Sequence, residues 1–565
     1  MKKFRWQLLI ILITGIVVGV LLIIQQLDET ETIESTPSPI AGGIYTEALI
    51  GEFMRLNPFL DIYNQPDHDV DQLIFNSLIR FDSRGIPQSE LAESWGVSRD
   101  GTIYNFSLRT NVFWHDGETF DASDVLLSID LMKSQHQLIP EDLQNFWEEV
   151  EVVVLSDSQL QFLLPEPFAP FLDYLTFGIL PEHIFAGLSL DEIIDHPFNL
   201  EPIGTGPFKF NRLLAENDQI VGVVLDAFDD YFLDRPYLDE INFRYYPTSE
   251  LAFEAYENGE VEGIGIVNDS ILQDVLAQPE LSIYTARKPM LTMVYLNLDN
   301  PEVEFLQTPN FRIALMASIN RDRIIANVYN GQAIPASGPI MPGTWAHYLD
   351  IETIHYDPVR AENLFESTGV TFDEEASTFL SESGTPIQLS LLYPETELHQ
   401  GIAEQIESDW EALGIEVTLV PKPYEDVLSD LAARDYQTCL VDINLTSSPD
   451  PDPYPFWGQA QMDSGQNYAE WDNRSASELL EQARLTMDFA ERGRLYRNFQ
   501  VVFMRELPSL PIFYPVYTYA VMEDIKGINF GPIFDVSDRF NNVHNWYILQ
   551  SLTTQSTPTS EESTP

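Results

Sequence analysis

The sequence contains very little cysteine and very little positive charge. Cys439 is the single cysteine among 565 residues, so no disulfide can form within the chain. A chain of this length buries enough apolar surface to fold without disulfides, so this absence does not decide its compartment. Lys and Arg number 29 against 89 Asp and Glu, a formal net charge of -60. We therefore expect no nucleic-acid partner, because phosphate binding needs clustered basic residues.

The signatures of common enzymes are also missing. Gly263 and Gly265 lack the third glycine of a dinucleotide-binding loop, because Asn268 stands at its position. There is no Gly-x-Ser-x-Gly elbow and no His-Glu-x-x-His zinc motif, and His347 and His355 lack a metal-ligand spacing. We therefore expect no catalytic residue, no metal and no cofactor. A hydrolase that acts in a cleft stays open as an alternative.

The N-terminus has the pattern of an export signal. Three basic residues precede an uncharged apolar run at 8–24, which is just long enough to span a bilayer. Neither a small-x-small cleavage site nor a lipid-accepting cysteine follows it. Residues 1–27 are therefore predicted to be an uncleaved signal anchor, with the rest of the chain outside the membrane; cleavage at an irregular site is the alternative. Residues 28–40 and 551–565, rich in Ser, Thr, Glu and Pro, are predicted to be a linker and a disordered tail.

The middle of the chain has the periodicity of a mixed α/β fold. Apolar residues alternate at 387–391, recur at helical spacing over 398–413 up to Gly414, and alternate again at 415–419. This pattern predicts a β-α-β unit, the element of a parallel sheet covered by helices.

Two helix starts are also predicted from capping residues. Asn310 is expected to cap a helix over 311–319. Ser475 and Glu478 have the spacing of a capping box at the start of another helix. No repeat or heptad pattern is present, so the sequence indicates an α/β protein of several lobes.

A series of ordered motifs resembles one known family. The motifs are Leu91-Ala-Glu-Ser-Trp95, Ser98-Arg-Asp-Gly101, Trp114-His-Asp-Gly117, Ala122-Ser-Asp124, Ile203-Gly-Thr-Gly-Pro-Phe208, Tyr356-Asp-Pro358, Asp450-Pro-Asp452 and Gly465-Gln-Asn-Tyr468. On these residues the sequence resembles the extracytoplasmic solute-binding proteins of oligopeptide, dipeptide and nickel ABC transporters, known as solute-binding protein family 5. The resemblance extends over residues 42–547.

The resemblance implies a periplasmic-binding-protein-like type II clamp, in which two α/β lobes close on a ligand and an extra domain is inserted into the first lobe. On that template, lobe I takes residues 41–74, 201–285 and 516–550. The inserted domain takes residues 75–200, and lobe II takes residues 286–515.

The resemblance also implies a function. The protein is expected to capture a peptide or similar small polar solute outside the membrane and deliver it to the permease and ATPase subunits of an ABC importer, acting as a monomer. Ligand that touches both lobes favours the closed state. The alternatives are a receptor for a metal chelate or other non-peptide solute, or a sensor that signals through a partner protein.

Candidate ligand-binding residues follow from the same resemblance. In peptide-binding relatives an acidic residue three positions before an Asp-Pro pair holds the ligand's amino terminus, but Ser447 stands at that position here. This departure leaves peptide specificity open, with a nearby aspartate as a possible replacement and ordinary core packing as the alternative for each aromatic ring. The candidates are Ser447, Asp450, Asp452, Trp457, Asn467, Tyr468, Trp345 and Asn57.

Overall fold

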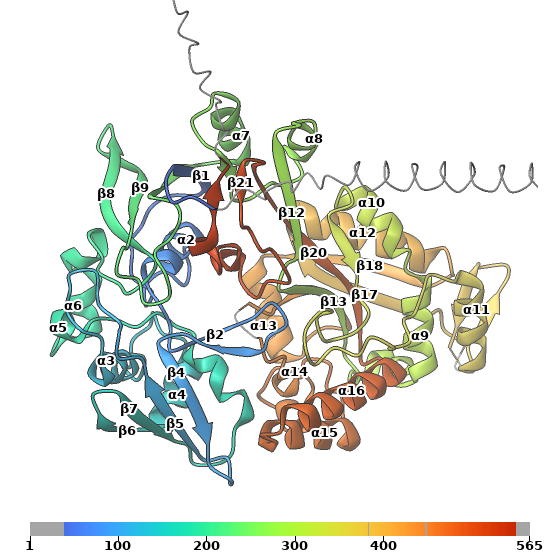
Figure 1. The fold of residues 1–565 in the computed structure, drawn as a ribbon. Coiled ribbons are helices and arrows are strands. Elements are labelled where there is room, and N and C mark those ends of the chain that lie inside the picture. Colours follow the sequence, from blue (N-terminus) through green and yellow to red (C-terminus); the bar gives the residue numbers. More distant parts are fainter. Residues whose placement is uncertain (1–38, 382–383, 447–448, 550–565) are drawn as a thin grey trace, which may run out of the picture. The chain divides into compact units, whose positions relative to one another are not determined.

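The computed structural model describes residues 39–549 apart from 382–383 and 447–448 (Figure 1). Residues Ala41–Ile548 form one compact unit. The predicted signal anchor, most of the linker and the predicted tail lie outside the described residues. Within the described ranges, no helix combines the length and apolar character needed to cross a membrane.

The described strands form one large mixed sheet and several small ones. Along the large sheet the order is β18 (Glu416–Lys422), β17 (Gln388–Pro394), β19 (Thr438–Asn444), β13 (Met290–Leu296), β20 (Ser509–Met522), β11 (Gly263–Ile264), β1 (Ile44–Ile50), β10 (Glu240–Tyr246), β9 (Gln219–Ala227) and β8 (Phe208–Glu216). Two more strands, β12 (Leu281–Arg287) and β14 (Ala333–Pro335), also pair with β20.

The smaller strands form separate sheets. A four-stranded sheet has the order β4 (Ala92–Val97), β5 (Ile103–Leu108), β7 (Gln159–Leu163) and β6 (Glu151–Ser156). Three two-stranded sheets pair β2 (Ile79–Phe81) with β3 (Pro87–Ser89), β15 (Thr371–Asp373) with β16 (Thr378–Leu380), and β21 (Ile525–Lys526) with β22 (Tyr547–Ile548).

The helices cover these sheets. They are α2 (Gln65–Ile74), α3 (Ala122–Met132), α4 (Glu141–Glu149), α5 (Glu182–Phe185), α6 (Leu190–Ile194), α7 (Ser249–Glu257), α8 (Leu272–Leu276), α9 (Pro309–Ser318), α10 (Arg321–Val328), α11 (Pro358–Ser367), α12 (Glu397–Glu411), α13 (Tyr424–Ala433), α14 (Tyr454–Trp457), α15 (Arg474–Leu485) and α16 (Phe489–Glu506). Short 3-10 helices include Ala169–Leu175 and Val536–Phe540.

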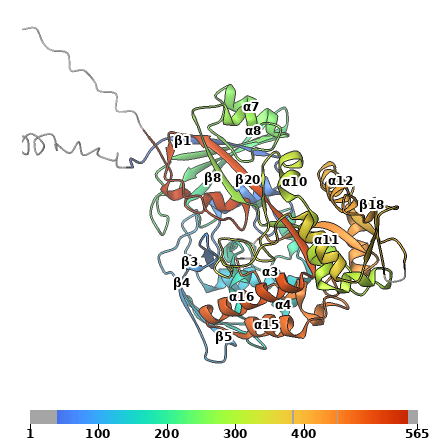
Figure 2. The same ribbon diagram turned by 90° about the vertical axis from the view of Figure 1, so that its right-hand side faces the viewer.

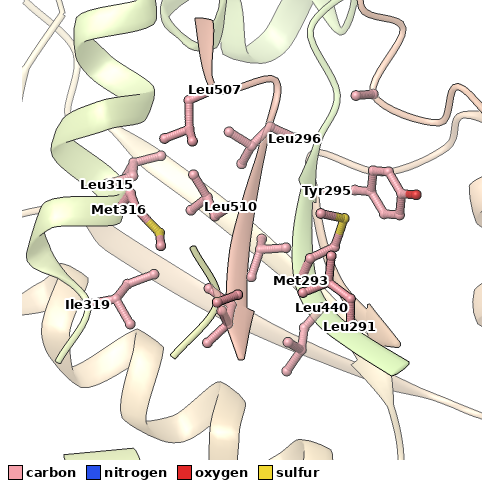
Figure 3. Close-up of a cluster of buried hydrophobic side chains, with 14 of the residues drawn as sticks. Leu291, Met293, Tyr295, Leu296, Leu315, Met316, Ile319, Leu440, Leu507 and Leu510 are labelled. Carbon is pink, nitrogen blue, oxygen red and sulfur yellow. The ribbon is translucent and has the colours of Figure 1, made fainter. Parts of the chain in front are cut away.

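The buried hydrophobic side chains of this unit form two large cores. Core A contains buried side chains from 45–245 and 517–546, and core B contains those from 291–514 together with Phe534. A third, smaller core lies beneath α7 and α8. Figure 3 shows part of core B, where Leu510 of β20 lies beside side chains of β13 and α9.

Strand β20 belongs to both large cores. Its residues up to Tyr514 are buried in core B, whereas Tyr517, Tyr519 and Val521 are buried in core A. The first part of the strand pairs with β13 and the second with β12. Figures 1 and 2 show β20 running from one group of strands to the other. The chain therefore crosses between the cores within a single strand.

The predicted β-α-β unit is confirmed. Strands β17 and β18 pair in parallel, and α12 connects them. Ile402, Ile406 and Trp410 of α12 are fully buried in core B. Gly414 has a φ of +90°, a conformation that favours glycine and redirects the chain into β18.

Both predicted helix starts were wrong by two residues. Helix α9 begins at Pro309, a residue favoured at the first helical position, and Thr308 at the N-cap position makes no side-chain capping hydrogen bond. Helix α15 is capped by Asn473, whose side chain accepts a 3.0 Å hydrogen bond from the backbone N–H of Ala476. Ser475 therefore lies inside the first turn. In both cases several good capping residues are adjacent, so local spacing alone did not identify the cap.

Candidate functional site

A cavity of about 510 Å³ lies between α2, residues 173–178 and the end of β19. Its volume is in the range of small-molecule and peptide sites. Aromatic side chains form part of its wall, from Phe75, Trp147, Tyr174 and Phe177. The cavity therefore collects residues of core A on one side and of the strand end next to core B on the other.

The cavity wall is strongly acidic. Five carboxylate residues line it: Asp61, Asp71, Glu90, Asp173 and Asp535. His68 is the one basic side chain among its described lining residues, and no Lys or Arg is among them. A wall of this charge favours a cationic ligand group over an anionic one.

A smaller cavity of about 130 Å³ adjoins the first and shares His68, Gln72 and Glu90 with it. Arg80 also lines this smaller cavity. The acidic wall of the larger cavity therefore lies next to Arg80, the single arginine among the described lining residues of the two cavities.

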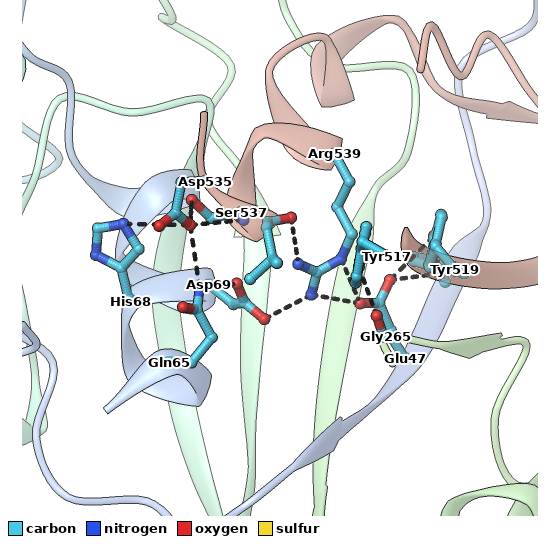
Figure 4. Close-up of polar contacts among 12 residues, drawn as sticks. Glu47, Gln65, His68, Asp69, Gly265, Tyr517, Tyr519, Asp535, Ser537 and Arg539 are labelled. Carbon is cyan, nitrogen blue, oxygen red and sulfur yellow. Dashed lines mark hydrogen bonds and ion pairs between the residues drawn. The ribbon is translucent and has the colours of Figure 1, made fainter. Parts of the chain in front are cut away.

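His68 connects two of the carboxylates. Its Nδ1 lies 2.8 Å from Asp61 Oδ2. Its Nε2 lies 3.8 Å from Asp535 Oδ1, a contact that Figure 4 shows. Burial lowers the pKa of His68, but the charge and hydrogen bond of Asp61, followed by the charges of Asp535 and Asp69, outweigh it and raise the pKa to about 10. His68 is therefore protonated at neutral pH and partly offsets the negative charge of this wall.

Asp71 lies on the same helix and has no comparable partner. Its side chain is only 2% exposed, and among the described residues it has no basic partner; it lies within hydrogen-bonding reach of the Asp61 carboxyl group and of the backbone of Asn57. Burial, followed by the charges of Asp61 and Asp67, raises its pKa well above the ordinary value. The raised pKa favours the neutral acid, which can share its proton with the Asp61 carboxylate.

The neighbouring Asp69 is fully paired. Its Oδ2 accepts a 2.7 Å hydrogen bond from Arg539, which also donates 2.8 and 3.0 Å bonds to Glu47 Oε1 (Figure 4). Tyr45 and Tyr519 donate to the other oxygen of Glu47, at 2.6 and 3.1 Å. This network is buried, and its role is to join α2, β1, β20 and the 3-10 helix near the C-terminus.

Asp450 and Asp452, two of the predicted site residues, form ion pairs with arginines. Asp450 is buried, pairs with Arg492 and accepts a 3.0 Å hydrogen bond from the Tyr496 hydroxyl. Asp452 Oδ2 lies 2.7 Å from Arg484 Nη2. Both carboxylates are thus neutralised by the protein itself.

Three further candidates contribute to the structure of core B. Trp457 is 2% exposed and packs edge-on against Phe503. Asn467 donates a 3.1 Å hydrogen bond to the carbonyl of Gly458, and Tyr468 lies beneath the guanidinium of Arg434.

The remaining candidates have similar surroundings. Trp345 stacks on Phe489 with ring centroids 4.0 Å apart, and its backbone N–H donates to the carbonyl of Arg84. Asn57 is buried and donates a 2.9 Å hydrogen bond to Asn199. Ser447 lies outside the described residues.

None of the seven described candidates lines the 510 Å³ cavity. Asp61 and Asp71, which do, were missed by the sequence analysis. The only sequence pattern that could have indicated Asp71 is the alternating aspartates of Asp67-His-Asp-Val-Asp71. This pattern does not stand out among 89 acidic residues. Over the described part of the chain, no group of three or more His, Cys, Asp or Glu residues is arranged to hold a metal ion.

Comparisons with known proteins agree with this architecture. A family model described as Bacterial extracellular solute-binding proteins, family 5 Middle, matches residues 87–466. The dipeptide-binding protein of Escherichia coli (strain K12) is 27% identical over 483 residues, which cover 81% of this chain and 87% of that protein. The oligopeptide-binding protein AppA of Bacillus subtilis (strain 168) is 23% identical, over 92% of this chain and 94% of AppA.

The fold is also similar to solved structures. HbpA2 from Haemophilus parasuis superposes with a TM-score of 0.78 at 20% identity, covering 90% of this chain and 100% of HbpA2. This similarity shows the two-lobed α/β clamp fold that the sequence predicted.

Proposed function

The chain belongs to the bacterial extracellular solute-binding proteins of family 5, and from this premise we propose that it is the substrate-binding subunit of an ABC importer that captures peptides. The observation that carries this proposal is the 510 Å³ cavity between the strand end of core B and the helices of core A. The two relatives are named as dipeptide-binding and oligopeptide-binding proteins, and these names favour a peptide ligand over a metal chelate. The protein binds its solute without chemical change and passes it to the permease and ATPase subunits.

The proposed mechanism is a hinged closure of two lobes. We propose the lobe boundaries predicted from the sequence, with crossings at 285/286 and 515/516. The change of core along β20 supports the second crossing, since it falls between Tyr514 and Tyr517. The two crossing segments touch, because the N–H of Lys288 donates a 2.8 Å hydrogen bond to the carbonyl of Pro515. Ligand that contacts both walls stabilises the closed state, which the permease recognises.

The apolar run at 8–24 supports a further part of the proposal, that residues 1–27 tether the protein to the outer face of the plasma membrane. Deletion of 1–27 should move the folded protein from the membrane fraction to the soluble fraction when it is exported by a cleavable signal. If the complete sequence is expressed and the protein is recovered in the soluble fraction without its N-terminal residues, the result would instead support cleavage.

The peptide proposal is tested by thermal unfolding and native mass spectrometry of the full chain with a mixture of two- to five-residue peptides. Peptide at about 100 times its Kd should raise the free energy of unfolding by about 2.7 kcal/mol, because it binds only the folded state. Asn444→Trp, which places a large ring at the exposed end of β19 in the cavity wall, should abolish the shift.

The matched control is Asn363→Trp, on the exposed surface of α11 and away from the cavity. It should keep the full shift. Absence of any bound peptide from wild-type protein across the mixture would refute peptide binding. An equal shift in Asn444→Trp would show that the peptide binds elsewhere.

A further inference from the structure

A charged contact joins the core A side and the core B side next to the cavity. Asp173 lies in the 3-10 helix Ala169–Leu175, whose apolar side chains belong to core A. Its Oδ2 accepts a 2.9 Å hydrogen bond from the backbone N–H of Asp450, which lies among residues of core B. Asp173 also lines the 510 Å³ cavity, and Asp450 does not. On the proposed lobe boundaries the two aspartates belong to different lobes, so opening the clamp separates them.

Further contacts join the same two sides. The guanidinium of Arg484, which pairs with Asp452, also lies over the ring of Phe168, 5.5 Å from its centroid. The hydroxyl of Tyr104 donates a 3.4 Å hydrogen bond to the sulfur of Met487. Met487 follows α15, yet its side chain packs against core A. The turn between α15 and α16 therefore rests on the predicted inserted domain.

The charges in this contact do not balance. Arg492 pairs with Asp450, and Arg484 pairs with Asp452, so each of these two carboxylates has its own cation. Asp173 adds a third carboxylate to the two ion pairs. Burial, followed by the charge of Asp450, raises the pKa of Asp173 well above its ordinary value, and the backbone hydrogen bond and the charge of Arg492 oppose this only in part. The neutral acid is therefore the favoured form of Asp173 in this contact.

We propose that Asp173, Asp450, Asp452, Arg484 and Arg492 form an interlobe latch, and that Asp173 takes up a proton when the latch closes. This inference rests on the clamp motion of the proposed function and adds a means of regulating it. When the lobes part, Asp173 leaves the neighbouring aspartates and is hydrated, so its carboxyl group is ionised as in an ordinary aspartate. Closure at neutral pH therefore requires a proton from the solvent.

The direction of the pH effect follows from this difference between the two states. The closed state binds more protons than the open state at pH values between about 4, the ordinary pKa of an aspartate, and the raised pKa of Asp173. Closure is therefore favoured most at low pH and weakens as the pH rises through the raised value. The charged groups that face Asp173 are Asp450, Asp452 and Arg492, while Arg484 and Asp142 face the adjoining Tyr174.

The experiment measures the open and closed populations of the full chain without ligand, by energy transfer between dyes on two introduced cysteines. These are Glu149→Cys on α4 and Gln482→Cys on α15, both at exposed positions, whereas Cys439 is buried and stays unlabelled. The proteins compared are the labelled wild type, Asp173→Asn and, as the matched control, Asp130→Asn on the exposed surface of α3.

We expect the ratio of closed to open wild-type protein to fall as the pH rises from about 5 to about 8, by up to about tenfold per pH unit, because closure takes up one proton. Asp173→Asn has a neutral amide of the same shape, so it should remain as closed at the upper pH as wild type is at the lower. Asp130→Asn should follow wild type. A wild-type ratio that does not change with pH, or that changes equally in Asp173→Asn, would overturn the latch.

Calorimetry with a peptide from the mixture above gives a second measure, which does not depend on how closed the free protein is. In buffers of different ionisation enthalpy, wild type should take up more protons on binding than Asp173→Asn, by up to about one. Equal uptake would count against the latch. Proton release relative to Asp173→Asn would also overturn it, because release is the result expected if Asp173 instead faced a cationic group of the ligand.

The failures of the latch and of the proposed function are distinguishable. A peptide that binds wild type and Asp173→Asn with the same affinity and the same proton uptake would overturn the latch and leave peptide binding intact. If no peptide binds while energy transfer still depends on pH through Asp173, the latch stands and the peptide proposal fails. Asp173→Ser, which also removes the carboxyl group, replaces Asp173→Asn in both measurements if the latter does not fold.

Discussion

Asp69 and Asp71 lie two residues apart on α2, both buried, and they differ in what surrounds them. Asp69 accepts hydrogen bonds from Arg539 and, at 3.0 Å, from Gln65. Asp71 has no basic partner among the described residues and instead lies within hydrogen-bonding reach of the Asp61 carboxyl group and of the backbone of Asn57. One helix therefore carries a carboxylate that is paired with a buried cation and another that is not.

This difference determines how each carboxylate affects stability. A buried ion pair resists loss of either member, because the other is then left alone in a poorly solvated place. A buried carboxylate with no partner disfavours the folded state until something binds it. Substitutions at the two positions should therefore have effects of opposite sign.

Arg539→Met is expected to have the largest effect. It leaves Glu47 and Asp69 buried without their cation, so the free energy of unfolding should fall by about 3–5 kcal/mol, measured by urea denaturation. The control Arg99→Met, at an exposed position, should change it by less than about 0.5 kcal/mol. Similar small effects for both variants would mean that the network in Figure 4 contributes little to stability.

The same substitution on the two aspartates gives the sharpest comparison. Asp69→Asn should lower the free energy of unfolding by about 1–3 kcal/mol, because it removes one charged partner of Arg539. Asp71→Asn should raise it by about 1–2 kcal/mol in the ligand-free protein at neutral pH, because it removes a buried carboxylate that faces another carboxylate and has no cation. Two destabilising variants would show that Asp71 is already satisfied in the free protein.

The smallest expected effect is the pH dependence of the increase in unfolding free energy caused by Asp71→Asn. Because the pKa of Asp71 is raised in the folded protein, its neutral form is favoured there, and wild type loses stability as pH rises through that raised value. The gain from Asp71→Asn should therefore be near zero at pH 4 and grow toward neutral pH. The groups that face Asp71 are Asp61, Asp67 and Tyr245, and they are the same in both proteins. A gain that is constant with pH would contradict the assignment.

Local periodicity predicted much of core B. The β17–α12–β18 unit was predicted because its apolar side chains repeat at the period of each element, a property that contacts with distant residues do not alter. The overall clamp fold followed from ordered motifs that resemble one family, and comparison with solved structures confirmed it.

The site could not be predicted in the same way. Asp450 and Asp452 are typical candidates for binding an ammonium, but Arg492 and Arg484, more than 30 residues later, neutralise them. Asp71 is the opposite case, because nothing in the neighbouring sequence shows that it has no basic partner. Whether a carboxylate is paired depends on residues that only the folded chain brings together, and periodicity carries no information on that.

The network around Glu47 also has a consequence for how the chain acquires its structure. Glu47 on β1 and Arg539 are separated by 492 positions, yet they are in direct contact. While the polypeptide emerges from a ribosome or a translocation pore, Glu47 on β1 appears long before Arg539, so it cannot be buried together with its cationic partner until residue 539 has been made. Completion of core A is consequently a late step, and a truncation before residue 539 should leave an assembly intermediate that chaperones and proteases can recognise.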